Sequence, residues 1–227
     1  MPRQSSQGTC KVCGKTFGKV AMTRHLQKCV EEHSAKGKDR VLRLLVEGHP
    51  SPYYWLHIEM PASAKLSQLD QFLRNIWLEC CGHLSEFRIA DETYDVAPEP
   101  DPWTGVKLKS MSTALGSILS VGDKFEHRYD FGTTTELALK VIAERQGALK
   151  SKEVRILARN DPPKFPCAIC GKPSTQVCTQ CVYEGPQAWL CEEHAEEHAC
   201  GGDYFLPVVN SPRVGLCGYT GESEFGR

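Results

Sequence analysis

The feature that most constrains this chain is a run of eight Cys and His residues. They form four close pairs: Cys167 with Cys170, Cys178 with Cys181, Cys191 with His194, and His198 with Cys200. Zinc takes four such ligands in a tetrahedron, so the run predicts two closed zinc sites. The short connections are compatible with an interleaved arrangement, in which pairs one and three share one ion and pairs two and four share the other, and the sequence alone does not choose the pairing. A sequential arrangement is the alternative.

Two other interpretations of this run compete with structural zinc. A disulfide framework gives the interspersed His no role, and 12 Cys without an N-terminal signal peptide are typical of a reducing compartment, so we expect a cytoplasmic protein. The alternative function is a zinc-dependent hydrolase, because His194, Glu197 and His198 match the H-x-x-E-H motif of inverted metalloproteases. A catalytic zinc keeps an open position for water, whereas Cys191 and Cys200 flank these histidines and would fill it. We therefore expect no catalytic residues.

A second metal pattern lies near the N-terminus. The spacing of a ββα zinc finger is shared by four residues: Cys10, Cys13, His25 and Cys29. A hairpin would carry the first two ligands. A helix from Lys19 to Glu32 would place the other two on one face, four residues apart. His33 is an alternative to Cys29 as the last ligand. The two patterns together predict three structural zinc ions.

Basic residues are concentrated in this same segment. Residues 1–40 carry nine Lys and Arg against three acidic residues, whereas residues 161–227 carry four against nine. The cations of the finger are Lys11, Lys15, Lys19, Arg24 and Lys28. Such a surface suits phosphate, so DNA or RNA is an expected partner, and docking to another protein is the alternative. No apolar run is long enough to cross a membrane, and no phosphate-binding loop or dinucleotide fingerprint predicts a small-molecule cofactor.

The middle of the chain predicts one α+β domain. Alternating or apolar runs predict strands at 41–47, 54–60, 86–90, 125–129, 136–142 and 153–158, with helices at 66–77 and 112–119 and a polar loop at 91–105. This order predicts a mixed sheet with helices on one face. The expected domains are a zinc finger at 1–35, the α+β domain at 36–160, and a Cys/His-rich module with a tail at 161–227.

The remaining Cys and acidic residues are expected to have ordinary roles. Cys80 and Cys81 follow the long helix and are interpreted as buried small apolar groups. Cys217 is interpreted as a spare thiol, or as a replacement for Cys200. Six residues could converge as an acid/base or metal site at a sheet edge: His83, Glu86, Asp91, Asp95, His127 and Asp130. Separate surface or hydrogen-bonded residues are the better interpretation of that set.

Two motifs in the middle domain resemble those of a known family. They are His83-Leu84-x-x-Phe87-x-Ile89 and Phe125-x-x-x-Tyr129-Asp130-Phe131-Gly132. They are similar to the open-reading-frame-three family first named from a root-inducing plasmid, over about residues 40–145. Some members are labelled insertion-element passenger proteins or resolvases. The resemblance implies a plasmid or mobile-element context but no established catalytic activity. The chain departs from the family after Gly132, where Thr133 to Leu137 replace its usual Asp, aromatic, Glu and His.

Overall fold

The structure is a computed structural model that describes residues 6–99, 105, 108–149 and 153–221. The chain divides into two compact units. The first comprises Met1–Leu73 and Leu84–Asp161, and the second comprises Arg74–His83 and Pro162–Arg227. None of the helices in the described ranges is long and apolar enough to span a membrane.

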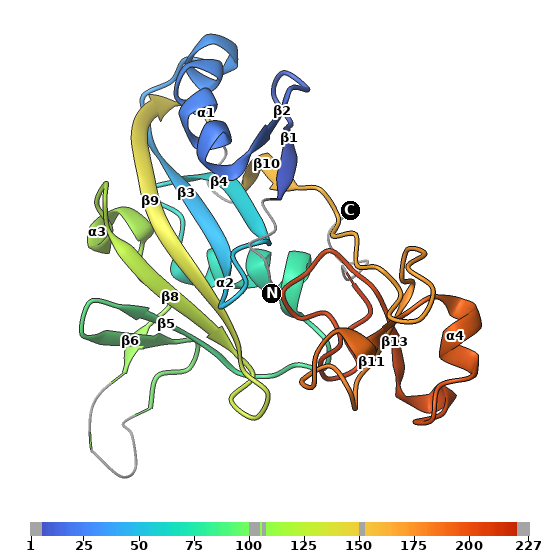
Figure 1. The fold of residues 1–227 in the computed structure, drawn as a ribbon. Helices are drawn as coiled ribbons and strands as arrows, with labels where there is room; N and C mark the ends of the chain where they lie inside the picture. The colour runs from blue at the N-terminus through green and yellow to red at the C-terminus, as the bar shows by residue number, and fades with distance from the viewer. Residues whose placement is uncertain (1–5, 100–104, 106–107, 150–152, 222–227) are drawn as a thin grey trace. The chain divides into compact units, whose positions relative to one another are not determined.

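One ten-stranded sheet forms the frame of the first unit (Figure 1). Its strands are β1 (Gln7–Cys10), β2 (Thr16–Gly18), β3 (Asp39–His49), β4 (Trp55–Pro61), β5 (Ser85–Ile89), β6 (Glu92–Asp95), β7 (Lys109–Ser110), β8 (Lys124–Tyr129), β9 (Thr135–Gly147) and β10 (Arg155–Asn160). Their order in the sheet is β2-β1-β10-β4-β3-β9-β8-β5-β6-β7. Because β6 and β7 run parallel while neighbours such as β3 and β4 run antiparallel, the sheet is mixed, and the predicted α+β class is confirmed.

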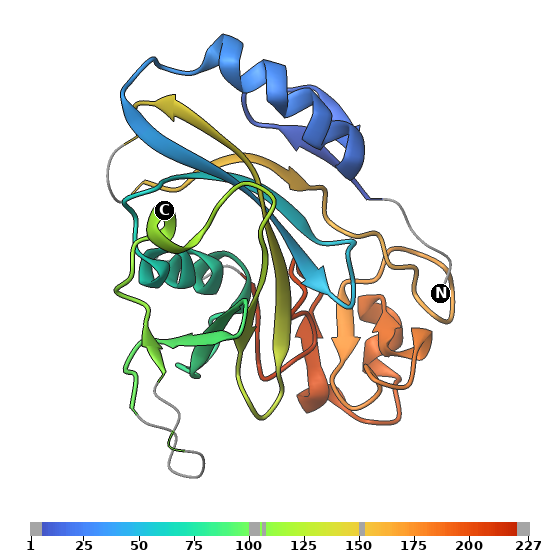
Figure 2. The same ribbon diagram turned by 90° about the vertical axis from the view of Figure 1, so that its left-hand side faces the viewer.

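The centre of this sheet is the predicted hairpin of β3 and β4. The two strands pair from Val41 opposite Pro61 to Glu47 opposite Trp55, and every residue of β4 is buried. Figure 2 shows the reason: α1 (Lys19–His33) lies along one face of the sheet and α2 (Leu66–Leu73) along the other. The short helix α3 (Leu115–Ile118) lies beside the start of α2. The helices of the middle domain therefore share one face, and the finger helix covers the opposite one.

Two elements differ from the sequence prediction. The segment expected as a loop after residue 90 contains β6, which pairs with β5 because Tyr94 opposite Phe87 buries a large aromatic side chain. The helix predicted at 66–77 is α2 followed by a π-helical turn, η1 (Arg74–Leu78). The hydrogen bond from the Glu79 N–H to the Arg74 carbonyl, 2.7 Å long, has the i to i+5 span of this wider helix.

The finger hairpin is part of the sheet. β1 pairs with β10, from Gly8 opposite Asn160 to Cys10 opposite Ala158, as well as with β2. Gly8 is required there because a Cβ atom would lie 2.2 Å from the Arg159 carbonyl oxygen. The 1–35 finger expected as a domain of its own thus shares backbone hydrogen bonds with the middle strands.

The finger helix packs on the sheet through apolar and polar contacts. Met22 and Leu26 are fully buried in a core that also contains Trp55. Arg43 of β3 donates to the Leu26 carbonyl oxygen at 3.0 Å, and its side chain is only 4% exposed. These contacts hold α1 in one position on the sheet.

The second unit contains a small sheet and short helices. Its strands are β11 (Gln176–Cys178), β12 (Trp189–Leu190) and β13 (Phe205–Pro207), in the order β12-β11-β13. Its helices, besides η1, are η2 (Pro186–Ala188), α4 (Glu192–Glu196) and η3 (Gly202–Tyr204). Its small buried cluster consists of two cysteines with Leu190 and Ala195. Other apolar side chains of this unit, such as Trp77, Val177 and Tyr219, are also buried.

Candidate metal centres

The first group of candidate ligands lies between the finger hairpin and α1. It consists of Cys10, Cys13, His25 and Cys29, whose ligand atoms all lie within 4.8 Å of one another. Cys13 Sγ lies 3.2 Å from His25 Nε2, and Cys10 Sγ lies 4.0 Å from Cys29 Sγ. The alternative ligand, His33, is outside the group, and its Nδ1 lies 2.8 Å from the Cys29 carbonyl oxygen.

Two Cys-x2-Cys turns in this chain have the same backbone geometry. In the finger, the Cys10 N–H donates to the Lys15 carbonyl and the Gly14 N–H donates to the Cys10 carbonyl, each at 2.9 Å. In the second unit, the Cys167 N–H donates to the Lys172 carbonyl at 2.7 Å, and the Gly171 N–H donates to the Cys167 carbonyl at 2.9 Å. Both sequences read Cys-x2-Cys-Gly-Lys, and both glycines have positive φ, 75° and 72°. The glycine lets the chain turn sharply enough for both sulfurs to face one point.

The second group joins this turn to the start of α4. It consists of Cys167, Cys170, Cys191 and His194. His194 Nδ1 lies 3.1 Å from Cys191 Sγ and 3.6 Å from Cys167 Sγ. Burial raises the pKa of Cys167, but backbone N–H groups that face its sulfur outweigh burial and bring the pKa to about 6. This thiol is therefore largely a thiolate at neutral pH, the form that binds metal.

The third group consists of Cys178, Cys181, His198 and Cys200. Cys181 Sγ lies 3.7 Å from Cys200 Sγ and 3.5 Å from His198 Nε2. Cys178 is the last residue of β11 and is fully buried. In the second unit, therefore, pairs one and three lie together and pairs two and four lie together. This is the interleaved arrangement, and the sequential one is not found.

The sulfur separations match those around one tetrahedral ion. Zinc with Zn–S bonds of ~2.3 Å places its sulfur atoms roughly 3.8 Å apart. The separations are 4.0 Å for Cys10 and Cys29, and 3.8 Å for Cys170 and Cys191. A disulfide would require about 2.05 Å, and the cysteines are all free thiols. Each group can therefore hold a metal ion.

The H-x-x-E-H motif does not form a single site. His194 belongs to the second group and His198 to the third, so the two histidines do not face one ion. Helix α4 ends at Glu196, and Glu197 is an exposed residue after it. The inverted-metalloprotease geometry needs both histidines on one metal with the Glu beside it, and this structure does not bring them together.

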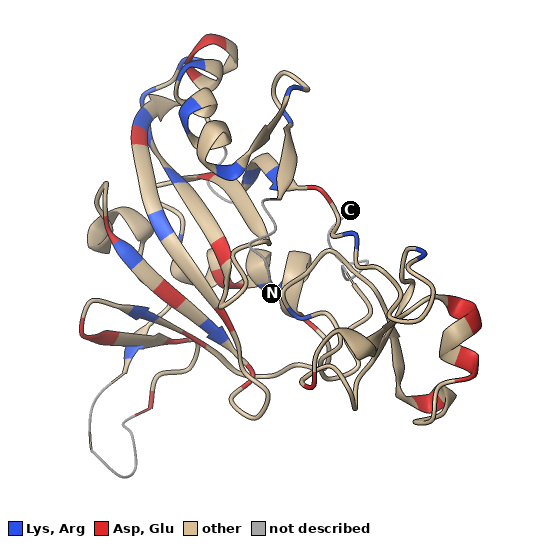
Figure 3. Ribbon diagram, viewed as in Figure 1, with Lys and Arg blue, Asp and Glu red and all other residues tan. Residues whose placement is uncertain are grey.

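Figure 3 marks the Lys and Arg positions along the ribbon, and the cations of the finger are mostly exposed. Lys11 and Lys15 are exposed on the hairpin, and Arg24 and Lys28 are exposed on α1. Lys19 differs because it is half-buried and forms an ion pair with Glu47 of β3. That pair neutralises the charge of Lys19, so four of the five predicted cations face solvent without this compensation.

The acid/base set of the middle domain does not converge. His127 is fully buried, and its Nε2 lies 2.7 Å from Asp70 Oδ1, which also accepts a hydrogen bond from Ser85 Oγ at 2.7 Å. Glu86 forms ion pairs with Arg88 and Arg128. The Asp130 carboxylate accepts from the Gly132 and Thr133 N–H groups and so shapes the turn between β8 and β9. These residues stabilise the fold separately.

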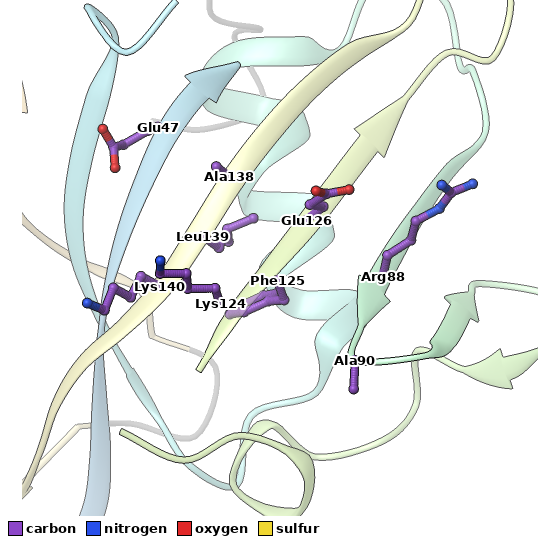
Figure 4. A pocket seen from close by; sticks show the side chains of 9 residues that line it. All are labelled: Glu47, Arg88, Ala90, Lys124, Phe125, Glu126, Ala138, Leu139 and Lys140. Atoms are coloured by element: carbon purple, nitrogen blue, oxygen red, sulfur yellow. The ribbon is translucent and has the colours of Figure 1, made fainter. Parts of the chain in front are cut away.

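A hollow of about 550 Å³ lies on the first unit's sheet (Figure 4). Its lining comes from β3, β5, β8 and β9 and carries charges of both signs: Glu47, Arg88, Lys124, Glu126 and Lys140. The apolar lining residues Phe125 and Leu139 are nearly fully buried. Glu47 is already paired with Lys19. The hollow thus combines buried apolar lining residues with charged side chains of both signs.

The structure contains a fourth group of candidate ligands that the sequence patterns did not predict. Cys80, Cys81, His83 and Cys217 lie within the second unit, with ligand atoms within 4.8 Å of one another. The interpretation of Cys80 and Cys81 as buried apolar groups is wrong, because Cys80 is only half-buried and Cys81 is exposed. Cys217 lies in this group and Cys200 lies in the third group, so Cys217 does not take the place of Cys200. The available signal was the short spacing Cys-Cys-x-His, but the fourth member is far away in the sequence.

The comparison with protein-family models agrees with the resemblance found in the middle domain. The model of the plasmid pRiA4b ORF-3-like protein family matches residues 41–165. A crystal structure of a protein of unknown function, MM3350 from Methanosarcina mazei Go1, is 18% identical with a TM-score of 0.43. That match covers 50% of this chain and 66% of the other. A comparison with curated proteins found no match.

Proposed function

Since the chain belongs to the plasmid pRiA4b ORF-3-like protein family and gathers its Cys and His into groups of four, we propose that it is a non-catalytic zinc protein. The observation that carries this proposal is that each group supplies three sulfurs and one imidazole nitrogen. Four protein ligands fill the tetrahedron of zinc and leave no position for a water nucleophile. The ions are structural: they stabilise a small second unit and fasten α1 to its hairpin.

We further propose that the finger surface binds nucleic acid by its phosphates, in the mobile-element or plasmid context that the family name suggests. Four exposed cations support this: Lys11 and Lys15 on the hairpin, and Arg24 and Lys28 on α1. One finger covers only ~3 base pairs, so contact is expected to be weakly sequence-dependent. Docking of an acidic protein on the same cations is the competing function.

Metal content of the full chain tests the first part. The protein purified in reducing buffer is expected to contain zinc in proportion to its ligand groups, and Cys29→Ser is expected to lose one ion. A substitution is preferable to removing residues 1–35, because β1 is a strand of the main sheet. His33→Gln is the matched control, since His33 lies outside the group, and it is expected to keep every ion. Zinc-free, folded protein would refute the proposal.

Salt-dependent retention on mixed-sequence double-stranded DNA tests the second part. Binding through four cations predicts that the logarithm of the association constant falls with the logarithm of salt concentration, with a slope of about −3 to −4. Changing Lys11, Lys15, Arg24 and Lys28 to Gln is expected to abolish retention. The matched control changes four exposed lysines elsewhere in the first unit: Lys65, Lys109, Lys124 and Lys140. If both variants lose DNA retention equally, or if the wild type is not retained on DNA at low salt, nucleic-acid binding by the finger is excluded. Docking of an acidic protein then becomes the favoured function.

A further inference from the structure

The fourth group of ligands goes beyond the three zinc ions expected from the sequence. We propose that Cys80, Cys81, His83 and Cys217 bind a fourth zinc ion, which fastens the 74–83 segment to the C-terminal tail inside the second unit. With this group, all 12 cysteines of the chain belong to four groups of the same composition, three Cys and one His. The inference does not depend on nucleic-acid binding.

The distances in this group are those of a tetrahedral site. Cys81 Sγ lies 3.7 Å from Cys80 Sγ and 3.9 Å from Cys217 Sγ, close to the roughly 3.8 Å expected around zinc. His83 Nε2 lies 3.0 Å from Cys81 Sγ and 3.2 Å from Cys217 Sγ. The imidazole is thus directed at the sulfurs from both segments. Three thiolates with one imidazole are a ligand set that selects a soft or borderline cation.

The backbone before the group is shaped to present adjacent cysteines to one point. The π-helical turn η1 ends at Leu78, two residues before Cys80, and such turns are frequent at functional sites. Gly82 has a φ of 81°, which lets the chain reverse so that His83 returns toward Cys81. Glu79 holds this reversal, because its carboxylate accepts from the Gly82 N–H at 2.6 Å and from Arg74 Nε at 2.7 Å.

The backbone at the other ligand is strained. Cys217 has a φ of 47°, a left-handed conformation that non-glycine residues seldom adopt, and Gly218 follows with 67°. The Tyr219 N–H closes this turn on the Leu216 carbonyl at 2.9 Å, and Tyr219 itself is buried. Strained residues of this kind are concentrated at ligand sites. Here the strain directs the Cys217 sulfur at the other three ligands.

A buried cation compensates the charge of the group. Arg213 is fully buried, and its Nη2 lies 3.4 Å from Cys80 Sγ. Three thiolates, a neutral imidazole and a divalent cation carry one net negative charge, which a neighbouring guanidinium offsets. The backbone of Arg213 is held in place because its amide N–H donates to Ser211 Oγ at 2.9 Å. The Ser211 hydroxyl in turn donates to the Trp77 carbonyl at 2.6 Å. The tail is therefore linked to η1 through Ser211 and to Cys80 through Arg213.

Counting zinc in matched variants tests the inference. Full-length protein, purified in reducing buffer, is expected to hold four ions, and Cys217→Ser is expected to hold three. Cys29→Ser is expected to remove a different ion, so that the double variant holds two. Three ions in both the wild type and Cys217→Ser would overturn the fourth site while leaving the other three. A Cys80–Cys81 disulfide, detected by mass in the reduced preparation, would also overturn it.

A second variant keeps the test decisive if Cys217→Ser loses more than one ion through misfolding. Cys217→His supplies another nitrogen ligand at the same position and is expected to hold four ions. With cobalt in place of zinc, its thiolate-to-metal absorption is expected to fall by about one twelfth, because one of twelve Co–S bonds is lost. Failure of Cys217→His to restore the fourth ion would overturn the proposal.

This group is also expected to release its ion before the others. None of its cysteines is buried, whereas each of the other groups has at least one buried Cys. A coloured chelator is expected to remove one ion per chain in a fast phase that is absent from Cys217→Ser. A fast phase that persists unchanged in this variant would contradict the assignment.

Discussion

The buried carboxylate of Glu59 offers a direct test of how the finger is held on the sheet. Glu59 lies on β4 and is fully buried. Its Oε1 accepts hydrogen bonds from Arg43 Nη2 at 3.1 Å and Arg145 Nε at 2.8 Å, and its Oε2 accepts from Arg145 Nη2 at 2.6 Å. Arg43 also donates to the Leu26 carbonyl oxygen of α1. The carboxylate thus connects β3, β4 and β9, and through Arg43 it reaches the finger helix.

The expected cost of Glu59→Gln follows from this burial. The variant keeps the size of the side chain but leaves the nearly buried guanidinium of Arg43 without its counter-charge. Removing one partner of a buried ion pair costs about 3–5 kcal/mol. Glu144→Gln is the matched control. Glu144 pairs with Arg40 through two 2.9 Å hydrogen bonds, but this pair is exposed, so its loss is expected to cost about 0–1 kcal/mol.

The pKa of Glu59 gives the same network a pH signature. Burial raises the pKa, but hydrogen bonds and charge from Arg145 and Arg43 outweigh it and place the pKa below its ordinary value of 4.5. A lowered folded-state pKa means that the contribution to stability is complete above about pH 4.5 and is lost as pH falls further. Wild-type protein is therefore expected to lose stability faster than Glu59→Gln below that pH.

The assay is urea unfolding at fixed free zinc, because bound metal adds its own stabilisation. Amide hydrogen exchange in α1 is measured alongside, and Glu59→Gln is expected to increase it. If Glu59→Gln unfolds within 1 kcal/mol of the wild type, or if Glu144→Gln costs as much, the proposed role of this network is wrong.

Two further predictions concern the same face of the sheet. Burial, with the charges of Arg43 and Lys19, lowers the pKa of His57 to about 3 from 6.5, so its stabilisation is lost as pH falls below 6.5. Between pH 7.5 and 5.5, urea unfolding should show the wild type losing about 1 kcal/mol more than His57→Gln. Equal losses would contradict this. Gly8→Ala is expected to destabilise the protein by about 1–3 kcal/mol in thermal unfolding, since its Cβ would meet the backbone of β10. Gly18→Ala, in an open position of the same hairpin, should change stability little, and equal effects would refute the packing argument.

Local spacing made much of the metal chemistry predictable from the sequence. Two Cys three residues apart need only one tight turn, and His25 and Cys29 need only one helical turn, so neighbouring residues decide these geometries. Alternating apolar residues likewise predicted the β3–β4 hairpin, and helically spaced ones predicted α2. These patterns depend on the residues inside one element and therefore survive without tertiary information.

The tertiary structure decided what depends on distant contacts. It brought Cys217 to Cys80, Cys81 and His83, and no spacing rule relates residues so far apart. It also separated His194 from His198, which a helical motif alone would have placed on one ion. The join of β1 to β10 depends on a backbone approach that only Gly8 permits, and this joined the finger to the middle sheet. Ligand type and local turn geometry are properties of the sequence, whereas ligand pairing and the cost of burial belong to the packed chain.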